Sequence, residues 1–378
     1  MKIGIFIDNF FDAQKYKDPG VIAQSLFDLG HQVTIYCLNT NSETFSTIIV
    51  KKINRADSTN YLFWKEEKID AVLMYSWLSL RFSKIIKAIS VNNIKLILKL
   101  DSDGHLIYPL TPRYLIHGPR DNSLKSLFLY ILRLIEWKIF PHIISRKKIE
   151  QIKIASALII ESSKAADNLS LSLNYYKENE LVKKINIVPN PIVVKFENSV
   201  LEKKNTIISV GRWNDKQKNS KTLEKIIRKF NRHNWRFLLF GEGSSRIVNN
   251  IKKHNSDINI YSQDSIEHDE ILKKMGESKI LFAPSIYEGY SISASEAVCC
   301  GCSIAGTPLE SFLCLTENED FGSLSKDFSI KSIEESLYKE IERWEKGEHF
   351  PETILNVSRK KLDPKKIGKK IEEIITLL

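Results

Sequence analysis

The chain has 378 residues, 43% of them hydrophobic and 27% charged, and a formal net charge of +10 at pH 7. This length exceeds what one ordinary core needs and predicts two domains of similar size, while the composition excludes an intrinsically disordered protein. Five cysteines are too few and too clustered for a disulfide framework, and no signal-peptide pattern follows Met1. We therefore expect a cytoplasmic protein in a reducing setting.

The positive charge has three explanations: a solvated basic surface, attraction to an anionic membrane, and binding of a phosphorylated substrate. Nucleic acid is not an expected partner, because no tract of Lys and Arg alternates with aromatic residues as nucleic-acid-binding surfaces require.

The first half of the chain alternates between strand-like and helix-like patterns. Buried apolar strands separated by helices predict a parallel, doubly wound sheet. The expected strands are residues 2–7, 32–37, 71–75, 95–100, 157–160 and 185–188, and the expected helices are residues 21–29 and 80–88.

A second alternation follows the break at Asn190-Pro191 and a polar segment at 195–205, which is the expected linker. Its strands are expected at 206–210, 236–240, 258–261, 280–283 and 303–305, and its helices at 221–230, 245–253, 266–275 and 291–300. The sequence thus predicts an α/β protein with two Rossmann-like doubly wound parallel-sheet domains facing across a cleft. The predicted parts are an N-terminal domain at 1–192, a C-terminal domain at 193–360, and a basic helix at 361–378 that packs back across to the first domain.

The longest apolar stretch, residues 124–144, is interrupted by Lys125, Arg133, Glu136 and Lys138, so it does not predict a membrane-spanning helix. It predicts an amphipathic helix with basic flanks. We favour a helix that packs on a core, and the alternative is attachment to the surface of a membrane.

Basic residues follow a predicted strand at Gly211-Arg212, with Lys216 and Lys218 before the next helix. In open α/β sheets, ligands bind at the carboxyl ends of strands, where helix N-termini attract anions. An Arg and a Lys six positions apart on such a loop are suited to holding a diphosphate from two sides. An ordinary charged loop is the alternative.

A second strand end carries Glu288 and Gly289, and the helix that follows contains Glu296. Gly289 permits a close approach of the backbone to a ligand, and both carboxylates are placed to accept hydrogen bonds from hydroxyl groups. For Glu296 there is a structural alternative, because Ser293 and Glu296 have the spacing of a capping box.

Residues 283–302 read APSIYEGYSISASEAVCCGC, with two glutamates separated by seven residues. This pattern resembles the retaining GT-B glycosyltransferases of the glycosyl transferases group 1 family, which includes sucrose synthase and the bacterial phosphatidylinositol mannosyltransferases. The Val210-Gly211-Arg212 strand end, Lys218 and the Phe240-Gly241-Glu242-Gly243 turn match in order and spacing. The resemblance is strong over 206–307 and looser across the first half.

The resemblance implies that the second half binds a nucleotide diphosphate sugar. Arg212 and Lys218 would neutralise the diphosphate, Glu288 would contact the transferred sugar, and Glu296 would hold the ribose hydroxyls. Further donor contacts are implied for Gly211, Gln263, Ile266, Gly289, Tyr290, Ser291 and Ile292, with Gln263 and Ile266 beside the base. The chain departs from the family where Asn219 replaces a glycine and where Tyr290-Ser291 replaces Phe-Gly, so neither the donor sugar nor the base is predicted.

For the first half, the resemblance implies acceptor binding. Gly20 lies where the family has a glycine-rich loop near the donor phosphate and acceptor. Asp101, Asp103 and His105 follow a predicted strand, where the family often places a histidine or aspartate beside the reacting sugar. We select Asp103 and Asp101 as catalytic candidates and His105 as a binding candidate; the alternative is that Asp103-Gly104 only forms a turn.

The implied reaction is sugar transfer with retention of configuration, without a metal or another cofactor, to a glycan or lipid-linked acceptor in cell-surface polysaccharide assembly. We expect contact with an anionic membrane at its inner face.

Two motifs have some resemblance to metal sites. Asp101-Ser102-Asp103 has the form of a metal-binding Asp-x-Asp motif but lies far from the expected diphosphate site. Cys299, Cys300 and Cys302 lack the spacing of zinc ligands and are expected to be small buried residues. The alternatives are a nucleotide-sugar epimerase on the same fold and a non-catalytic subunit that binds a sugar nucleotide.

Overall fold

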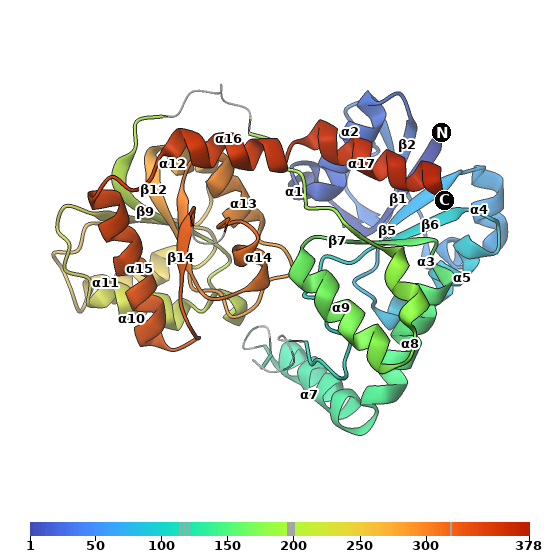
Figure 1. The fold of residues 1–378 in the computed structure, drawn as a ribbon, viewed down its shortest axis with the longest axis horizontal. Coiled ribbons are helices and arrows are strands. Elements are labelled where there is room, and N and C mark those ends of the chain that lie inside the picture. Colours follow the sequence, from blue (N-terminus) through green and yellow to red (C-terminus); the bar gives the residue numbers. More distant parts are fainter. Residues whose placement is uncertain (113–114, 116–117, 120, 122, 195–200, 318–319) are drawn as a thin grey trace. The chain divides into compact units, whose positions relative to one another are not determined.

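The computed structural model describes the chain except residues 113–114, 116–117, 120, 122, 195–200 and 318–319. Its contacts divide the chain into two compact units (Figure 1). The first unit consists of Met1–Pro112, Ile135–Val193 and Leu362–Leu378, and the second consists of Arg113–Leu134 and Val194–Lys361.

The first unit is built on an eight-stranded sheet with the order β3-β4-β2-β1-β5-β6-β7-β8, in which only the β3–β4 pair is antiparallel. Apolar side chains are buried on both faces, as a parallel sheet covered by helices requires. Its strands are β1 (Lys2–Phe10), β2 (Gln32–Thr40), β3 (Thr44–Phe45), β4 (Ile48–Lys52), β5 (Ala71–Tyr75), β6 (Lys95–Lys99), β7 (Ala157–Ile160) and β8 (Ile185–Ile187).

Helices from distant parts of the chain cover this sheet. The last helix packs on α2, and the contact is so close that a Cβ on Gly368 would lie 2.7 Å from Cβ of Ser25. The helices are α1 (Asp12–Lys15), α2 (Asp18–Asp28), α3 (Arg55–Ser58), α4 (Tyr61–Glu67), η1 (Leu80–Phe82), α5 (Ser83–Ser90), α8 (Pro141–Ile154), α9 (Ser163–Tyr175), η2 (Asn179–Lys184) and α17 (Pro364–Leu377).

The second unit has a six-stranded, fully parallel sheet with the order β11-β10-β9-β12-β13-β14. Its strands are β9 (Lys204–Val210), β10 (Arg236–Phe240), β11 (Ile260–Gln263), β12 (Ser278–Ala283), β13 (Ser303–Gly306) and β14 (Gly322–Leu324). Its helices are η3 (Lys216–Lys218), α10 (Ser220–Arg228), α11 (Ser244–Lys252), α12 (His268–Glu277), α13 (Ile292–Cys299), α14 (Glu310–Leu313), α15 (Ile330–Glu345) and α16 (Pro351–Lys361).

The expected strands at 71–75, 157–160 and 236–240 are confirmed residue for residue. The predicted linker at 195–205 is wrong at its end, because β9 starts at Lys204 and pairs there with Ser278 of β12; residues 195–200 lie outside the described part. Strands β3, β4 and β14 were not predicted from the sequence.

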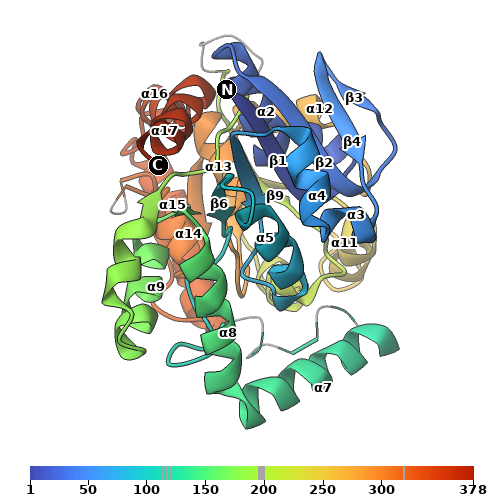
Figure 2. The ribbon, with the colours of Figure 1, turned by 90° about the vertical axis from the view of Figure 1, so that its right-hand side faces the viewer.

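The expected helix at 124–144 is two helices. α7 (Leu124–Ile139) ends before Pro141, and α8 begins at that proline, whose fixed φ suits the first turn of a helix (Figure 2). The preferred interpretation of this segment as a core-facing helix is wrong for α7, since none of its residues is buried. Among the described helices, none has the length and apolar character needed to cross a membrane.

Candidate functional site

The loops after β9 and β10 pass close to each other, and glycines make this approach sterically possible. A Cβ on Gly241, whose φ is +105°, would lie 2.2 Å from the carbonyl oxygen of Gly211. A Cβ on Gly211 would lie 3.1 Å from Cγ of Lys218, so the lysine stem packs directly over this turn. The carboxyl ends of two neighbouring strands and the lysine are therefore held together as one surface.

Lys218 and Glu288, predicted separately from two motifs, are in contact. Lys218 Nζ donates to Glu288 Oε1 over 2.7 Å, and Gln217 Nε2 donates to the second oxygen over 2.8 Å. Arg212 lies at the same strand end, where its Nη2 is 3.1 Å from Asp215 Oδ2, and its side chain is 59% exposed. The guanidinium is therefore accessible to a ligand, whereas the lysine is already engaged with the carboxylate.

Asn219, which replaces the family's usual glycine, has φ +52° and ψ +44°. Asparagine is one of the few residues other than glycine that adopt this left-handed conformation readily. Asn219 thus provides a left-handed turn between Lys218 and the start of α10 that a glycine would also allow.

Glu296 is buried on α13 and does not form the capping box that its spacing with Ser293 suggested. The N-cap of α13 is Ser291, which forms no side-chain capping bond. Instead, Glu296 Oε1 lies 2.6 Å from Nε2 of His268, the first residue of α12. The carboxylate is therefore held by a neighbouring helix rather than by its own.

The other predicted residues of this unit lie around the same strand ends. Gln263 is the last residue of β11, and its Nε2 donates to the carbonyl oxygen of Ser265 over 2.8 Å. Tyr290 and Ser291 are buried before α13, which starts at Ile292. Gly289 precedes them, and Ile266 is half-buried between β11 and α12.

The first unit contains a buried ionic cluster at the carboxyl edge of its sheet. Lys99, the last residue of β6, donates from Nζ to Glu161 Oε1 over 2.5 Å and to Asn190 Oδ1 over 2.6 Å, and lies 3.7 Å from Asp18 Oδ2. Only 1% of Lys99 is exposed. Burial lowers the pKa of Lys99, but the negative charges of Glu161 and Asp18 raise it by more than burial lowers it. The net shift of the pKa is therefore upward, and the ammonium stays charged.

Asp101 belongs to this cluster, and the pKa of its carboxyl group is well above that of an ordinary aspartate. Its backbone N–H donates to Glu161 Oε1 over 3.0 Å, and Trp77 bonds to its side chain. Burial, then the negative charges of Glu161 and Asp18, raise the pKa of Asp101 to about 8. Burial also raises the pKa values of Asp18 and Glu161, although the Lys99 ammonium opposes the shift at both carboxyl groups.

Three residues beside this cluster have left-handed backbone conformations that side chains disfavour. The φ angles are +47° at Trp77, +47° at Leu78 and +43° at Asp101. Such backbone strain persists only where the surroundings enforce it, and it concentrates at functional sites. The end of β5 and the end of β6 are therefore the strongest candidates for a functional site within the first unit.

Asp103 and His105 form the turn that was the alternative to a catalytic role. The His105 N–H donates to Asp103 Oδ1 over 3.1 Å, and Asn168 Nδ2 donates to the carbonyl oxygen of Asp103 over 2.9 Å. A Cβ on Gly104 would lie 1.9 Å from the carbonyl oxygen of Ala165, so glycine is required. The structural role is therefore established by geometry, and it leaves the carboxylate beside the His105 ring, at 3.5 Å.

Gly20 has a packing role. A Cβ at this position would lie 2.5 Å from the carbonyl oxygen of Lys15, so the glycine allows the first turn of α2 to pack against the end of α1.

Residues 193–356 match the family model described as glycosyl transferases group 1. This part of the chain is therefore similar to the group 1 glycosyltransferases, and the chain has a GT-B fold. Solved structures of similar fold cover almost the whole chain. Sucrose-phosphate synthase from Thermosynechococcus elongatus is 12% identical in sequence, with a TM-score of 0.68, and the match covers 100% of this chain and 98% of that chain. HepE from Anabaena in complex with UDP-glucose is 12% identical, with a TM-score of 0.67, and the match covers 100% of both chains. WaaG, a glycosyltransferase involved in lipopolysaccharide biosynthesis, is 14% identical, with a TM-score of 0.65, and the match covers 99% of both chains. No curated protein matched by sequence.

Sequence reasoning missed four residues that the structure places beside those it named. Lys99 and Glu161 are the buried ion pair of the first unit, and Gln217 and His268 hold the two glutamates of the second unit. A lysine inside the apolar run at 95–100 was the one available signal for the ion pair, because a buried ammonium requires an acidic partner.

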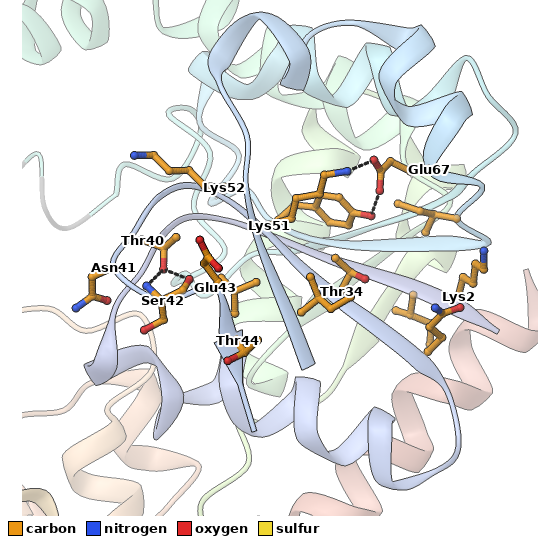
Figure 3. Close-up of a pocket in the computed structure, with 16 residues that line it drawn as sticks. Lys2, Thr34, Thr40, Asn41, Ser42, Glu43, Thr44, Lys51, Lys52 and Glu67 are labelled. Atoms are coloured by element: carbon orange, nitrogen blue, oxygen red, sulfur yellow. Dashed lines mark hydrogen bonds and ion pairs between the residues drawn. The ribbon is translucent and has the colours of Figure 1, made fainter. Parts of the chain in front are cut away.

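A cavity of about 960 Å³ lies on the first unit away from all predicted site residues, over β2 and β4 (Figure 3). Figure 3 shows Lys51 pointing toward Glu67, and Tyr36 donates its hydroxyl to the other oxygen of that carboxylate over 2.6 Å. Both oxygens are thus used to join β2, β4 and α4. These contacts give Tyr36, Lys51 and Glu67 a structural role in the cavity wall.

The cysteines near α13 are small buried residues, as the sequence predicted. Cys302 Sγ donates to the carbonyl oxygen of Met275 over 2.9 Å, and burial raises the pKa of the Cys299 thiol to about 12. Metal ligands are thiolates, whereas this environment keeps the proton on sulfur. Within the described ranges, no three His, Cys, Asp or Glu side chains are arranged to hold a metal ion.

Proposed function

We propose that the protein is a retaining glycosyltransferase that moves a sugar from a nucleotide diphosphate sugar to a hydroxyl group of a glycan, without a metal ion. The observation that carries this proposal is the grouping of Arg212, Lys218 and Glu288 at carboxyl strand ends, with Glu296 on the helix α13 that follows β12, in the part of the chain that matches the group 1 glycosyltransferase model. HepE, whose fold is similar, is described in complex with UDP-glucose.

Arg212 and Lys218 are proposed to bind the diphosphate and to stabilise the charge that develops on it as it leaves. The exposed guanidinium offers two parallel donors to phosphate oxygens. Lys218 is held 2.7 Å from Glu288, so its position is fixed before the donor arrives. Preorganised cations of this kind supply the electrostatic stabilisation that a divalent ion supplies in other enzymes.

Glu288 is proposed to contact the hydroxyls of the transferred sugar and Glu296 those of the ribose, with the base beside Gln263 and Ile266. In the reaction, the bond between the anomeric carbon and the diphosphate oxygen breaks while the acceptor oxygen bonds to that carbon from the same face. The acceptor proton passes to the leaving diphosphate oxygen. Asp101, Asp103 and His105 are the candidates in the first unit for contacts with the reacting sugar or the acceptor.

Calorimetric binding of UDP, GDP, ADP and dTDP without metal tests this proposal. We expect one nucleotide to bind selectively and its affinity to fall about tenfold or more in Arg212→Ala and in Glu296→Ala, because each loses a polar contact to the ligand. Binding that is equal in all three proteins would contradict the assignment of the pocket. If the folded wild-type protein binds none of the four, the function as a transferase is wrong.

Two alternatives make different predictions in the same preparation. An epimerase needs no acceptor and would convert the donor sugar into its epimer in the absence of one. A non-catalytic subunit would bind the nucleotide but turn over no donor with any acceptor offered.

We further propose that the acceptor is a lipid-linked glycan at the cytoplasmic face of an anionic membrane, in cell-surface polysaccharide assembly. The helix α7 supports this proposal, since its apolar side chains are solvent-exposed along its length. Phe128 is 61% exposed and Ile139 is 60% exposed, and the exposed apolar residues of α7 are Leu124, Leu127, Phe128, Leu129, Ile131, Leu132, Ile135 and Ile139. An apolar helix face of this size on a soluble protein marks an interaction surface.

The charges on this segment favour an anionic membrane as the surface it contacts. Among the charged side chains of residues 124–147, basic ones outnumber acidic ones. The basic residues are Lys125, Arg133, Lys138, Arg146 and Lys147, and the acidic residue is Glu136. An amphipathic helix that combines an apolar face with basic residues binds anionic lipid surfaces. WaaG, of similar fold, is described as involved in lipopolysaccharide biosynthesis.

Flotation with vesicles tests the role of α7. We expect the protein to float with vesicles containing anionic phosphatidylglycerol and to stay in solution with neutral phosphatidylcholine vesicles. The double variant Phe128→Glu and Ile135→Glu should lose this binding, while Val91→Glu, which places one negative charge on an exposed apolar residue outside α7, should keep it. A wild-type protein that binds neither kind of vesicle would overturn the proposal, and a dimer formed through α7 would identify a second copy of the chain as its partner instead.

A further inference from the structure

We propose that His268 is a positioning residue for the nucleotide, because it orients the Glu296 carboxylate toward the ribose hydroxyls. This inference rests on the proposed function, since it takes Glu296 as the ribose-binding residue. It adds a residue that no sequence motif indicated, because His268 lies on α12, outside the motifs that contain Arg212, Lys218, Glu288 and Glu296.

The contact is short and directional. His268 Nε2 lies 2.6 Å from Glu296 Oε1, and since a carboxylate only accepts, the imidazole donates. No second hydrogen bond to this carboxylate occurs among the residues that the structure describes, so Oε2 remains for a ligand hydroxyl. The side chain of Glu296 is only 9% exposed and that of His268 is 29% exposed, which places the imidazole at the solvent side of the pair.

The backbone fixes both partners before any ligand binds. Glu296 is in the second turn of α13, a helix with six buried residues, and His268 is the first residue of α12. Met275 and Leu272 bury α12 in the core, and α12 and α13 pack against each other. The imidazole therefore has a defined place from which to hold the carboxylate.

A glutamate needs this support because its side chain is flexible. Ordering a free Glu side chain costs rotamer entropy, and a ligand that meets a disordered carboxylate must supply that free energy. A carboxylate already held through one oxygen avoids most of that loss and presents the other oxygen in one direction. Loss of the imidazole should therefore weaken the contact to ribose and leave the rest of the nucleotide site unchanged.

The test compares each nucleotide with its counterpart lacking a ribose hydroxyl. UDP, 2′-deoxy-UDP and 3′-deoxy-UDP, with the GDP and ADP series in parallel, are titrated into wild type, His268→Ala, His268→Gln and Glu296→Gln. We expect His268→Ala to bind the ribonucleotide about 5–20-fold more weakly. Its loss for the deoxynucleotide that lacks the hydroxyl bound by Glu296 should be less than about twofold, and His268→Gln, whose amide also donates, should recover most of the affinity.

A matched control is His254→Ala, just after the end of α11, where ring Nδ1 lies 2.9 Å from the carbonyl oxygen of Asn250, four residues earlier in the chain. It should bind all nucleotides as wild type does. Equal losses for ribo- and deoxynucleotides in His268→Ala, or no loss while Glu296→Gln loses affinity, would overturn the role of His268 but keep the proposed function. No binding by wild type would overturn both.

Discussion

Replacing Lys218 by methionine is expected to lower kcat for sugar transfer by about 1,000-fold, because the diphosphate would leave without the cation preorganised beside it. The measurement is the transfer rate at saturating donor. Methionine keeps the length of the stem that packs over Gly211, so the turn is preserved. The substitution also leaves Glu288 with one partner, the amide of Gln217, and we expect the free energy of unfolding to fall by about 1–3 kcal/mol.

The double variant Lys218→Met and Glu288→Gln separates the two consequences. Removing both charges should restore most of the lost stability in urea unfolding, since no unpaired carboxylate remains, but it should not restore kcat. Lys216→Met is the matched control, because this exposed lysine lies in the same short helix η3. A kcat within about threefold of wild type in Lys218→Met would show that the ion pair is structural only.

The sequence predicted the architecture well because buried parallel strands leave a clear pattern. Apolar runs such as 71–75 and 236–240, in which only Arg236 is charged, have no amphipathic ambiguity, and they are β5 and β10 with the same bounds. Short strands were missed because their apolar runs are brief. In β4, the apolar residues Ile48, Ile49 and Val50 are followed at once by Lys51 and Lys52.

Contacts between distant segments explain what sequence reasoning missed in the candidate site. Glu296 lies three residues after Ser293, so a local capping box was a reasonable alternative, whereas its actual partner His268 is 28 residues away. Likewise, nothing within 216–218 indicates that both Gln217 and Lys218 bond to Glu288. The motif spacing placed the reactive groups at strand ends, and only the fold determines which of them meet.

The segment 124–144 shows how far composition alone can be interpreted. Its apolar positions repeat as they do in a helix that packs on a core, and the sequence contains no sign of whether a core is available. In the structure α7 has no buried residue, so the same side chains form a surface instead. The choice between the two interpretations depends on tertiary structure, and the structure decides it against the core.

Asp101→Asn is expected to stabilise the protein at neutral and alkaline pH, although Asp101 is a proposed functional residue. The pKa of its carboxyl group is raised to about 8, mainly by burial and then by Glu161 and Asp18. The folded protein therefore keeps a proton that the unfolded chain releases near pH 4. Asparagine is neutral at every pH and also accepts the left-handed backbone of this position, where φ is +43°.

The sign of the pH dependence follows from this proton. Between about pH 4 and pH 8 the folded state binds more protons than the unfolded state, so Asp101 lowers stability as pH rises and has no further effect above its folded pKa. Asp101→Asn should thus match wild type near pH 4 and exceed it by about 1–3 kcal/mol at pH 8. Urea unfolding at pH 5, 6, 7 and 8 measures the difference, with the exposed Asp167→Asn as the control.

The same variant should lose transferase activity if the proton or the carboxyl group of Asp101 serves the reaction. A gain in stability together with a loss of kcat is the expected behaviour of a site whose groups are arranged for chemistry rather than for folding. The strained backbone at Trp77, Leu78 and Asp101 fits that behaviour. If Asp101→Asn is instead less stable than wild type at pH 8, Asp101 is ionised and paired with Lys99, and the carboxyl edge of this sheet is a structural ion-pair network.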